Sequence, residues 1–225
     1  MDSNPSASSP PSLRRRLLGQ MKHVGASLLP HALLVRRGNT RGRRIALTFD
    51  DGPDAMTPVY LDLLDRLGVR ATFFVVGRAC AENRAALLDT IARGHEVAGH
   101  GFTHRRFTKL SALELRDELA QTAALLPPPQ ARRALLRPPH GTTSLATLAR
   151  CARAGYTTVL WSCDSLDART SSADEVAAAL VPERVSPGDI VLLHEGQQWT
   201  LDALPRVVDG LRGAGYDLVT VGDLL

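Results

Sequence analysis

Residues 45–53 have the sequence IALTFDDGP, an apolar and β-branched run followed by two acids and a turn. The apolar run predicts a buried strand, and the Gly-Pro pair ends it. Side chains alternate between the faces of a strand, but a turn breaks this alternation, so Asp50 and Asp51 can face one cavity. Two adjacent carboxylates do not titrate alike: a cation keeps one ionised and leaves the other free to handle protons. An ordinary Asp-Gly turn with solvated acids is the alternative.

Apolar strands and amphipathic helices alternate from residue 44 onward. We expect strands at residues 45–49, 71–76, 95–98, 135–137, 157–161, 189–194 and 217–221. The spacing of apolar residues predicts helices at residues 57–67, 84–93, 111–126, 143–154, 172–180 and 201–213. Near-continuous apolar strands separated by such helices indicate a parallel sheet covered on its outer face. The fold class is therefore α/β, with a small or incomplete (β/α) barrel favoured over a doubly wound open sheet.

The net charge of +4 conceals a difference between two parts of the chain. Residues 1–44 contain nine Lys or Arg and one acid, whereas the remaining 181 residues contain 18 basic and 22 acidic side chains. We assign residues 1–43 to a basic extension, Ser/Pro-rich and disordered at its start, and residues 44–225 to a single folded domain. The absence of a basic stripe with interleaved aromatics argues against a nucleic-acid partner.

The apolar part of the extension bears on where in the cell the protein is located. Residues 17–35 are moderately apolar, but Lys22, His23 and Pro30 interrupt them, so they are too short and too polar to span a bilayer. They match a signal peptide poorly, which predicts a cytoplasmic protein or one peripheral to the membrane. Peripheral contact of this basic segment with an anionic membrane surface is an alternative to a solvated tail.

Chemically useful side chains follow the predicted strands at their carboxyl ends, where (β/α) barrels carry their active sites. His100 and His104 are four positions apart. On one helical turn this spacing places two imidazoles on the same side, where they can share a metal ion. Two histidines and one carboxylate leave coordination positions open for water and substrate, as in catalytic sites. Two unrelated surface histidines are the alternative.

Three further stretches end predicted strands in polar residues. Residues 135–141, LLRPPHG, place Arg137 before two prolines, which fix the backbone around the guanidinium. Residues 161–167, WSCDSLD, place two acids three positions apart. Residues 190–194, IVLLH, end a buried strand in His194. Each stretch alone also fits a structural role, such as a strand terminator or a satisfied core histidine.

Together these stretches resemble, in order and approximate spacing, the five motifs of the polysaccharide deacetylase family, the NodB-homology or carbohydrate esterase family 4 group. The matching stretches are residues 50–53, 100–104, 137–139, 164–167 and 192–194. Residues 71–77 also look like the family's second strand, and the resemblance covers residues 44–225. It implies a distorted (β/α)7, TIM-like barrel and a hydrolase that removes N-acetyl, or alternatively O-acetyl, groups from an acetylated sugar or polysaccharide. It also implies a divalent metal, usually Zn²⁺.

The resemblance assigns roles by position. It implies three metal ligands: Asp51, His100 and His104. Asp50 would be the general base and His194 the general acid. Arg137 resembles the residue that orients Asp50, and Asp167 the residue that holds His194. The backbone N–H of His140 would help to stabilise the oxyanion.

Three positions depart from the family pattern. Gly101 stands where Ser or Thr is usual, which removes a hydroxyl that would brace the histidine loop. His140 replaces the commoner Tyr, with little expected loss because the backbone N–H is what acts there. Ala168 replaces a Trp, which opens one wall of the acetyl pocket and loosens the support of His194. We hypothesise that Trp199 fills this gap.

Two other functions remain as alternatives. A deacylase of a lipid-linked sugar at the membrane would suit the basic N-terminal segment. A non-catalytic carbohydrate-binding barrel belongs to a different class, and the complete set of acids and histidines argues against it. A barrel scaffold does not choose among substrates, so the sequence leaves the natural substrate, the metal and the oligomeric state open.

Overall fold

The structure, a computed structural model, describes residues 33–129 and 133–225. Within these residues nine strands form one sheet in the order β1-β6-β5-β4-β3-β2-β8-β7, with β9 also pairing with β2. The strands are β1 (Leu34–Val35), β2 (Arg44–Asp50), β3 (Thr72–Val75), β4 (Glu96–Gly99), β5 (Ala134–Leu136), β6 (Tyr156–Val159), β7 (Cys163–Asp164), β8 (Ile190–His194) and β9 (Asp217–Val219). All pairs between these strands are parallel.

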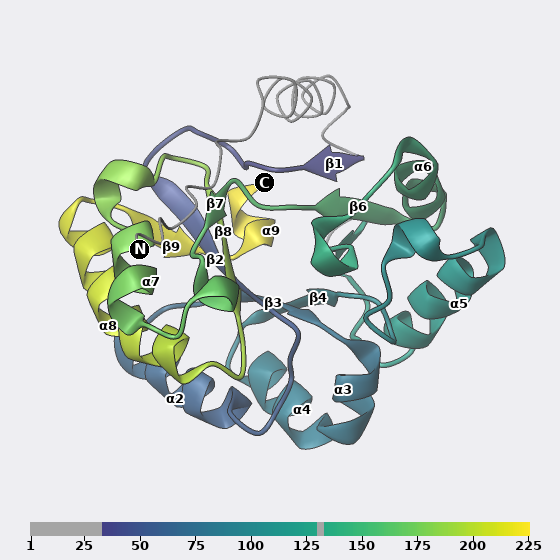
Figure 1. Cartoon of the computed structure of the whole chain (residues 1–225), viewed down its shortest axis with the longest axis horizontal. Helices are drawn as coiled ribbons and strands as arrows, with labels where there is room; N and C mark the ends of the chain where they lie inside the picture. The colour runs from purple at the N-terminus through teal and green to yellow at the C-terminus, as the bar shows by residue number, and fades with distance from the viewer. Residues whose placement is uncertain (1–32, 130–132) are drawn as a thin grey trace, which may run out of the picture.

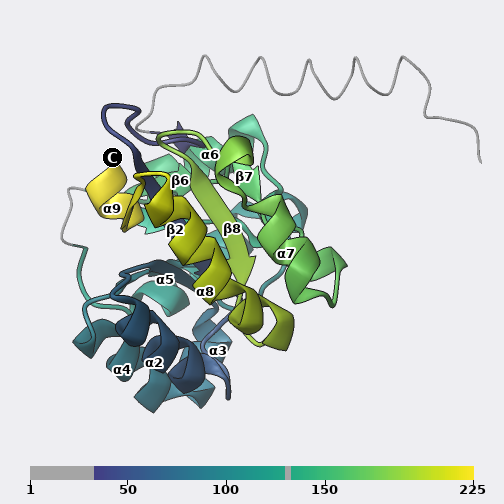
Figure 2. The same ribbon diagram turned by 90° about the vertical axis from the view of Figure 1, so that its left-hand side faces the viewer.

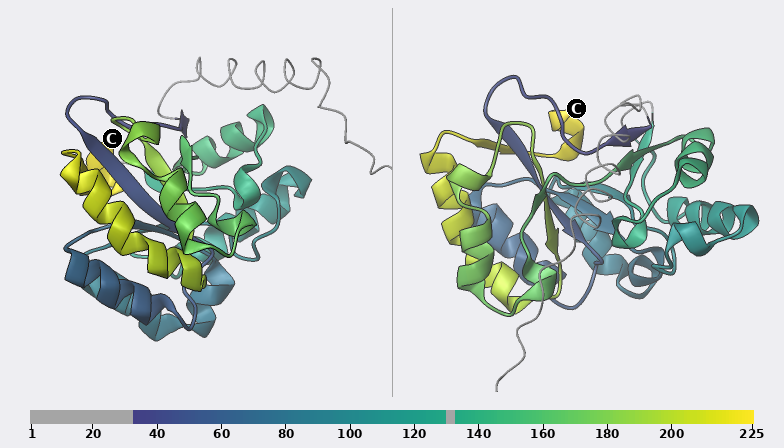
Figure 3. Two further views of the ribbon diagram at one scale, coloured as in Figure 1. Left: turned by 60° about the vertical axis from the view of Figure 1, so that its left-hand side comes forward. Right: turned by 45° about the horizontal axis from the view of Figure 1, so that its top comes forward.

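The helices lie outside the strands (Figure 1). They are α2 (Thr57–Leu67), α3 (Gly77–Glu82), α4 (Arg84–Ala92), α5 (Ala112–Ala123), α6 (Leu145–Arg153), α7 (Ala173–Ala179), α8 (Gln198–Gly213) and α9 (Val221–Leu224). Short 3-10 turns occur at Phe107–Lys109, Pro139–Gly141, Asp167–Arg169 and Pro182–Arg184. Figure 2 shows α7 and α8 beside β8, with α2 and α4 below them. In Figure 3, α7 and α8 lie on one side of the molecule and α5 and α6 on the other.

The sheet curves into an incompletely closed barrel, because residues of strands that are not neighbours meet inside it. Ala98 of β4, Val159 of β6 and Ile190 of β8 belong to one buried cluster. Arg137, just after β5, donates a hydrogen bond to Asp50 of β2, although two strands separate β5 from β2. In an open sheet of this order, side chains of β5 and β2 would be too far apart to form such a hydrogen bond. The predicted α/β barrel is therefore confirmed, and the doubly wound alternative is wrong.

Strand β2 shows how the chain separates core from site. Ile45, Leu47 and Phe49 belong to the large cluster that the outer helices cover. The residues between them have the opposite orientation: Thr48 and Asp50 receive hydrogen bonds from the buried Arg137 inside the barrel. Because strand side chains alternate, the same strand supplies apolar packing outside and polar groups inside.

Several elements differ from the prediction. The expected helix at 84–93 is preceded by a separate helix α3, because Asn83 leaves the helical conformation between them. Helix α8 begins at Gln198 rather than at 201, which places Trp199 in its first turn. Strand β1, at Leu34–Val35, lies within the stretch assigned to the extension and pairs with β6. A capping box of Ser111 and Glu114 opens α5, at the start of the helix expected at residues 111–126.

No helix in residues 33–129 or 133–225 has both the length and the apolar character needed to cross a membrane. Most of the segment 17–35, which the sequence analysis connects with membrane contact, lies outside the described residues.

Candidate metal and catalytic site

The two acids that end β2 have different surroundings. Asp50 is buried, with 3% of its surface exposed, whereas the side chain of Asp51 is 45% exposed. Asp51 has a left-handed backbone (φ 78°), so the strand ends there and the alternation of side chains is broken. Both carboxylates lie near the imidazole of His100, whose Nε2 is 3.4 Å from Asp51 Oδ1 and 3.7 Å from Asp50 Oδ2. The turn therefore brings both acids to one side, as the sequence predicts.

Asp51, His100 and His104 form a compact cluster of potential metal ligands. Each offers one ligand atom, and these atoms all lie within 4.8 Å of one another. His104 Nε2 is 3.0 Å from Asp51 Oδ1. Burial alone would raise the pKa of Asp51, but hydrogen bonds and charge from the two histidines lower it overall. One carboxylate and two imidazoles are a ligand set that suits a catalytic divalent ion with open positions.

The tautomer of His100 also fits a metal ligand. Its Nδ1 lies 2.7 Å from the carbonyl oxygen of Arg137, which can only accept, so Nδ1 carries the hydrogen. In the neutral ring, Nε2 then has the lone pair that a metal ligand needs, and it lies 3.4 Å from Asp51 Oδ1. Metal-bound histidines commonly have their second nitrogen oriented in this way by a carbonyl or a carboxylate.

The two histidines do not lie on a helix, so the predicted helical turn is wrong. Residues 100–104 form an irregular loop after β4, in which Gly101 (φ 81°) and His104 (φ 59°) are left-handed. The loop reverses direction and returns His104 toward Asp51. The i, i+4 spacing therefore places both imidazoles together by a different geometry from the one it suggests.

Arg137 neutralises Asp50 inside the barrel. Its guanidinium is fully buried and donates from NH1 to Asp50 Oδ1 (2.6 Å) and to the Thr48 hydroxyl (2.7 Å). The guanidinium also lies 4.0 Å from the centre of the Phe74 ring. Asp50 Oδ1 is thus occupied by Arg137, whereas Oδ2 faces the candidate ligand His100. Asp50 Oδ2 is therefore available for proton transfer, while the charge of Asp50 is balanced by Arg137.

His194 is held by Asp167. Its Nδ1 donates to Asp167 Oδ1 (2.8 Å), and its backbone N–H donates to Oδ2 (2.7 Å). The Thr200 hydroxyl donates to the same Oδ2 at 2.9 Å. Burial alone would lower the pKa of His194, but the hydrogen bond and charge of Asp167 outweigh it and raise the pKa. His194 and Asp50 are partners in register on β8 and β2, so the two side chains start from adjacent positions.

The remaining candidates lie at the edge of this site. The ring of His140 is 4.6 Å from that of His104, and His140 has a left-handed backbone (φ 58°). Its backbone N–H forms no hydrogen bond with any residue in the described ranges, so it is available as a donor. The indole N–H of Trp199 donates to the carbonyl of Asp167 at 2.8 Å, immediately before Ala168. Trp199 therefore contacts the segment that holds His194.

Backbone strain is concentrated around the site. In residues 33–129 and 133–225 the non-glycine residues with positive φ are Asp51, His104, His140 and Leu166. The first three are candidate site residues, and Leu166 precedes Asp167. Such conformations cost about 1–3 kcal/mol each and persist where surrounding contacts enforce them. This clustering separates the site loops from the ordinary turns of the barrel.

Sequence reasoning missed several residues that support the site. The Thr48 hydroxyl accepts a hydrogen bond from Arg137, and the Thr200 hydroxyl donates one to Asp167. Glu118 accepts hydrogen bonds from the loop at residues 100–104. Thr200 and Glu118 belong to no recognisable motif, and Thr48 lies in the stretch 45–53 without a role assigned to it. Thr48 could have been found from the alternation in β2, which predicts that it faces the same side as Asp50. The other two depend on the packing of distant helices.

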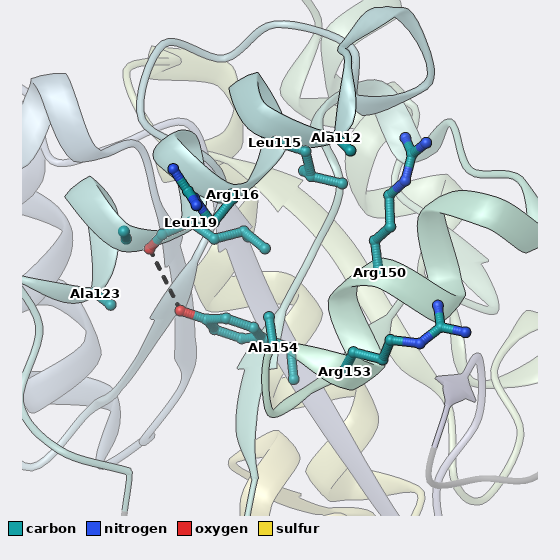
Figure 4. A pocket seen from close by; sticks show the side chains of 10 residues that line it. Ala112, Leu115, Arg116, Leu119, Ala123, Arg150, Arg153 and Ala154 are labelled. Atoms are coloured by element: carbon teal, nitrogen blue, oxygen red, sulfur yellow. Dashed lines mark hydrogen bonds between the residues drawn. The ribbon is translucent and has the colours of Figure 1, made fainter.

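A groove of about 510 Å³ lies elsewhere, between α5 and α6 (Figure 4). Its walls are largely aliphatic, with three arginines at the edge, and the Tyr156 hydroxyl donates to the Leu119 carbonyl across it. The lining residues are Ala112, Leu115, Arg116, Leu119, Ala120, Ala123, Arg150, Arg153, Ala154 and Tyr156. No candidate site residue is among them, so the groove is separate from the chemistry described above.

A parallel α/β barrel with an Asp-His-His cluster beside a buried Asp-Arg pair is suited to metal-dependent hydrolysis. A sequence model of the family described as polysaccharide deacetylase matches residues 37–159. The chain belongs to this family, the NodB-homology or carbohydrate esterase family 4 group, as the motifs predict. The family is metal-dependent, and the Asp51, His100 and His104 cluster supplies ligands of the required kind.

Individual relatives agree with this assignment. The chain is 34% identical to a chitooligosaccharide deacetylase of Bradyrhizobium sp. over 204 residues, which covers 82% of this chain and 93% of the relative. It is 32% identical to a bifunctional xylanase/deacetylase of Pseudobutyrivibrio xylanivorans, covering 89% of this chain but only 36% of that protein. The crystal structure of the Bc1960 peptidoglycan N-acetylglucosamine deacetylase superposes with a TM-score of 0.80 at 28% identity, covering 86% of this chain and 92% of the other.

Proposed function

We propose that this protein hydrolyses the N-acetyl groups of an acetylated amino-sugar polymer, with Zn²⁺ as the catalytic ion. The observation that carries the proposal is the position of Asp50. One of its oxygens is bound by Arg137, and the other lies 3.7 Å from His100, a member of the candidate ligand cluster. A base placed beside a divalent ion is the arrangement that amide hydrolysis by water requires. The family relationship and the names of the relatives support an acetylated carbohydrate as substrate.

Asp51, His100 and His104 would hold the ion, since their ligand atoms already lie together and His100 presents a free Nε2. Two imidazoles and one carboxylate with open positions form a ligand set of the kind found in catalytic zinc sites. When bound, such an ion polarises the acetyl carbonyl and lowers the pKa of water.

Proton transfers fall to the other two groups. Asp50 would accept a proton from the attacking water, because its negative charge is compensated by Arg137 and one oxygen is free. His194 would donate a proton to the nitrogen of the breaking amide bond, because Asp167 raises its pKa and so favours the protonated ring. The free N–H of His140 would donate to the oxygen that gains charge during attack. Water and the acetamide are consumed, and acetate and a free amine are released.

The test separates metal binding from proton transfer. In Asp50→Asn we expect zinc to remain bound while acetate release from N-acetylglucosamine oligomers falls at least about 100-fold, because the base is lost. In His100→Ala we expect the zinc content itself to fall, since one ligand is removed. Both quantities are measured on each variant, by metal analysis and by acetate determination.

The chain offers matched controls for both variants. Asp189 is another buried acid (2% exposed) paired with an arginine, Arg37, but it precedes β8 at the opposite end from the site. His95 is a buried histidine at the start of β4. Asp189→Asn and His95→Ala should keep both zinc and turnover. Full activity of Asp50→Asn, or a normal zinc content in His100→Ala, would contradict the proposal.

A further inference from the structure

A buried carboxylate from α5 lies beneath the loop that carries the two candidate histidine ligands. Glu118 is 6% exposed. Its Oε2 accepts hydrogen bonds from the backbone N–H groups of Phe102 (2.6 Å) and Thr103 (2.9 Å). Its Oε1 accepts a hydrogen bond from the Thr103 hydroxyl. Both oxygens of one acid are therefore used by residues that lie between His100 and His104.

The loop needs such support, because it has no regular structure of its own. Gly101 and His104 are left-handed, and for His104 this conformation is strained. On the other side, α3 donates from the backbone N–H groups of Gly77 and Arg78 to the carbonyls of Gly101 and Phe102. Helix α3 thus binds the loop's carbonyls and Glu118 binds its N–H groups. Contacts of both kinds over-determine the loop conformation.

Gly101 has a left-handed backbone (φ 81°), and a Cβ atom at this position would lie 3.0 Å from the Phe107 ring. The family pattern has a hydroxyl residue there, which Gly101 cannot supply. Glu118 Oε2 would be 3.4 Å from that Cβ atom, which is an ordinary van der Waals contact. The hydrogen bonds of Glu118 to Phe102 and Thr103 brace the loop by another route.

We propose that Glu118 is a positioning residue for the metal site: it fixes the loop so that His104 stays beside Asp51. This inference rests on the proposed function, because it concerns the affinity of the same ligand cluster. Glu118 touches neither the ligands nor the substrate and acts through Phe102 and Thr103, which adjoin His104. Residues that hydrogen-bond to a metal ligand typically contribute about 10- to 100-fold to metal affinity. Glu118 lies one step further from the ligands, so we expect a contribution near the lower end of this range.

The experiment measures the zinc dissociation constant by competition with a chromophoric chelator, and separately the thermal stability of the metal-free protein. Glu118→Ala should weaken zinc binding about 10-fold. Glu118→Gln keeps one acceptor oxygen for the two N–H groups and should recover most of the affinity. Thr103→Val removes one of the three hydrogen bonds. Its zinc affinity should lie between those of Glu118→Ala and the unmodified protein.

The control removes stability from the same helix without touching the brace. Ser111 caps α5, and Ser111→Ala should lower the stability of the metal-free protein while leaving the zinc dissociation constant unchanged. Equal zinc affinity in Glu118→Ala and the unmodified protein would overturn the inference. A loss of zinc affinity in Ser111→Ala as large as that in Glu118→Ala would also overturn it, because the stability of helix α5 would then explain the effect. If Glu118→Ala does not fold, a zinc affinity of Thr103→Val equal to that of the unmodified protein overturns the inference. Failure of the unmodified protein to bind zinc would instead reject the proposed function.

Discussion

Replacing Arg137 by methionine tests the electrostatic basis of the site. The guanidinium is fully buried, the Asp50 side chain is 4% exposed, and the two are 2.6 Å apart. Methionine fills a similar volume but leaves the carboxylate buried without its partner. Removing one member of a buried ion pair typically costs about 3–5 kcal/mol. We expect Arg137→Met to lower the free energy of unfolding by that amount.

The assay is urea unfolding at neutral pH in the presence of a chelator, for Arg137→Met, Asp50→Asn and the double variant. The double variant has no unpaired buried charge. Its free energy of unfolding should therefore fall by less than the sum of the decreases in the two single variants. For side chains in direct contact, we expect the decrease in the double variant to be about 2 kcal/mol smaller than that sum. Arg37→Met is the control: Arg37 is 45% exposed and pairs with buried Asp189, so water can partly replace it and the loss should be smaller.

Two results would refute this reasoning. The first is a loss below about 1 kcal/mol in Arg137→Met, which would mean that Asp50 is neutral or solvated without its partner. The second is additivity of the two single substitutions, which would mean that the two side chains do not interact energetically.

Three further predictions concern other parts of the site. Asp167→Asn removes the charge that raises the pKa of His194, so the loss of turnover on the alkaline side should begin at lower pH in a pH–rate profile. Gly101→Ser should lower the free energy of unfolding by about 1–2 kcal/mol, because residue 101 has φ 81° and its Cβ would lie 3.0 Å from Phe107. Burial raises the pKa of Glu195 to about 8, so the folded state holds a proton that the unfolded state releases near pH 4.5. Stability of the metal-free protein should therefore fall as pH rises from about 4.5 to 8, and Glu195→Gln should flatten this dependence.

Each of these predictions has a contradicting result. An unchanged alkaline limb in Asp167→Asn would mean that Asp167 does not set the pKa of His194. A Gly101→Ser protein as stable as the unmodified one would mean that the loop relaxes around a side chain. An unfolding free energy equally dependent on pH in Glu195→Gln would assign that dependence to other groups.

The sequence predicts the barrel from short-range patterns, whereas the candidate ligands are named from the family resemblance and their role stays a prediction. The run 45–49 has the alternation and β-branching of a strand, and helix α2 begins and ends where the apolar spacing indicates. Asp50 and His194 are the last residues of β2 and β8, and His100 directly follows β4. The carboxyl ends of parallel strands meet at one edge of a barrel. The juxtaposition of these side chains therefore follows from the fold class.

The supporting contacts could not be predicted in this way. The loop at 100–104 has the spacing of a helical turn but takes another shape, because its backbone bonds to α3 and to Glu118 rather than to itself. Thr200 reaches Asp167 only because α8 begins three residues earlier than its apolar pattern suggests. Strand β1 has only two residues, too few for a periodic signal, and forms because β6 has a free edge. Tertiary packing decides all three.

The most direct test of the central claim, a catalytic metal held by Asp51, His100 and His104, is acetate release from N-acetylglucosamine oligomers before and after metal removal. The purified protein is analysed for metal, treated with a chelator and then restored with zinc. We expect bound zinc in the untreated protein, loss of acetate release on chelation and recovery when about one equivalent of zinc is returned. Acetate release that survives complete metal removal, or a protein that binds no divalent ion, would contradict the account.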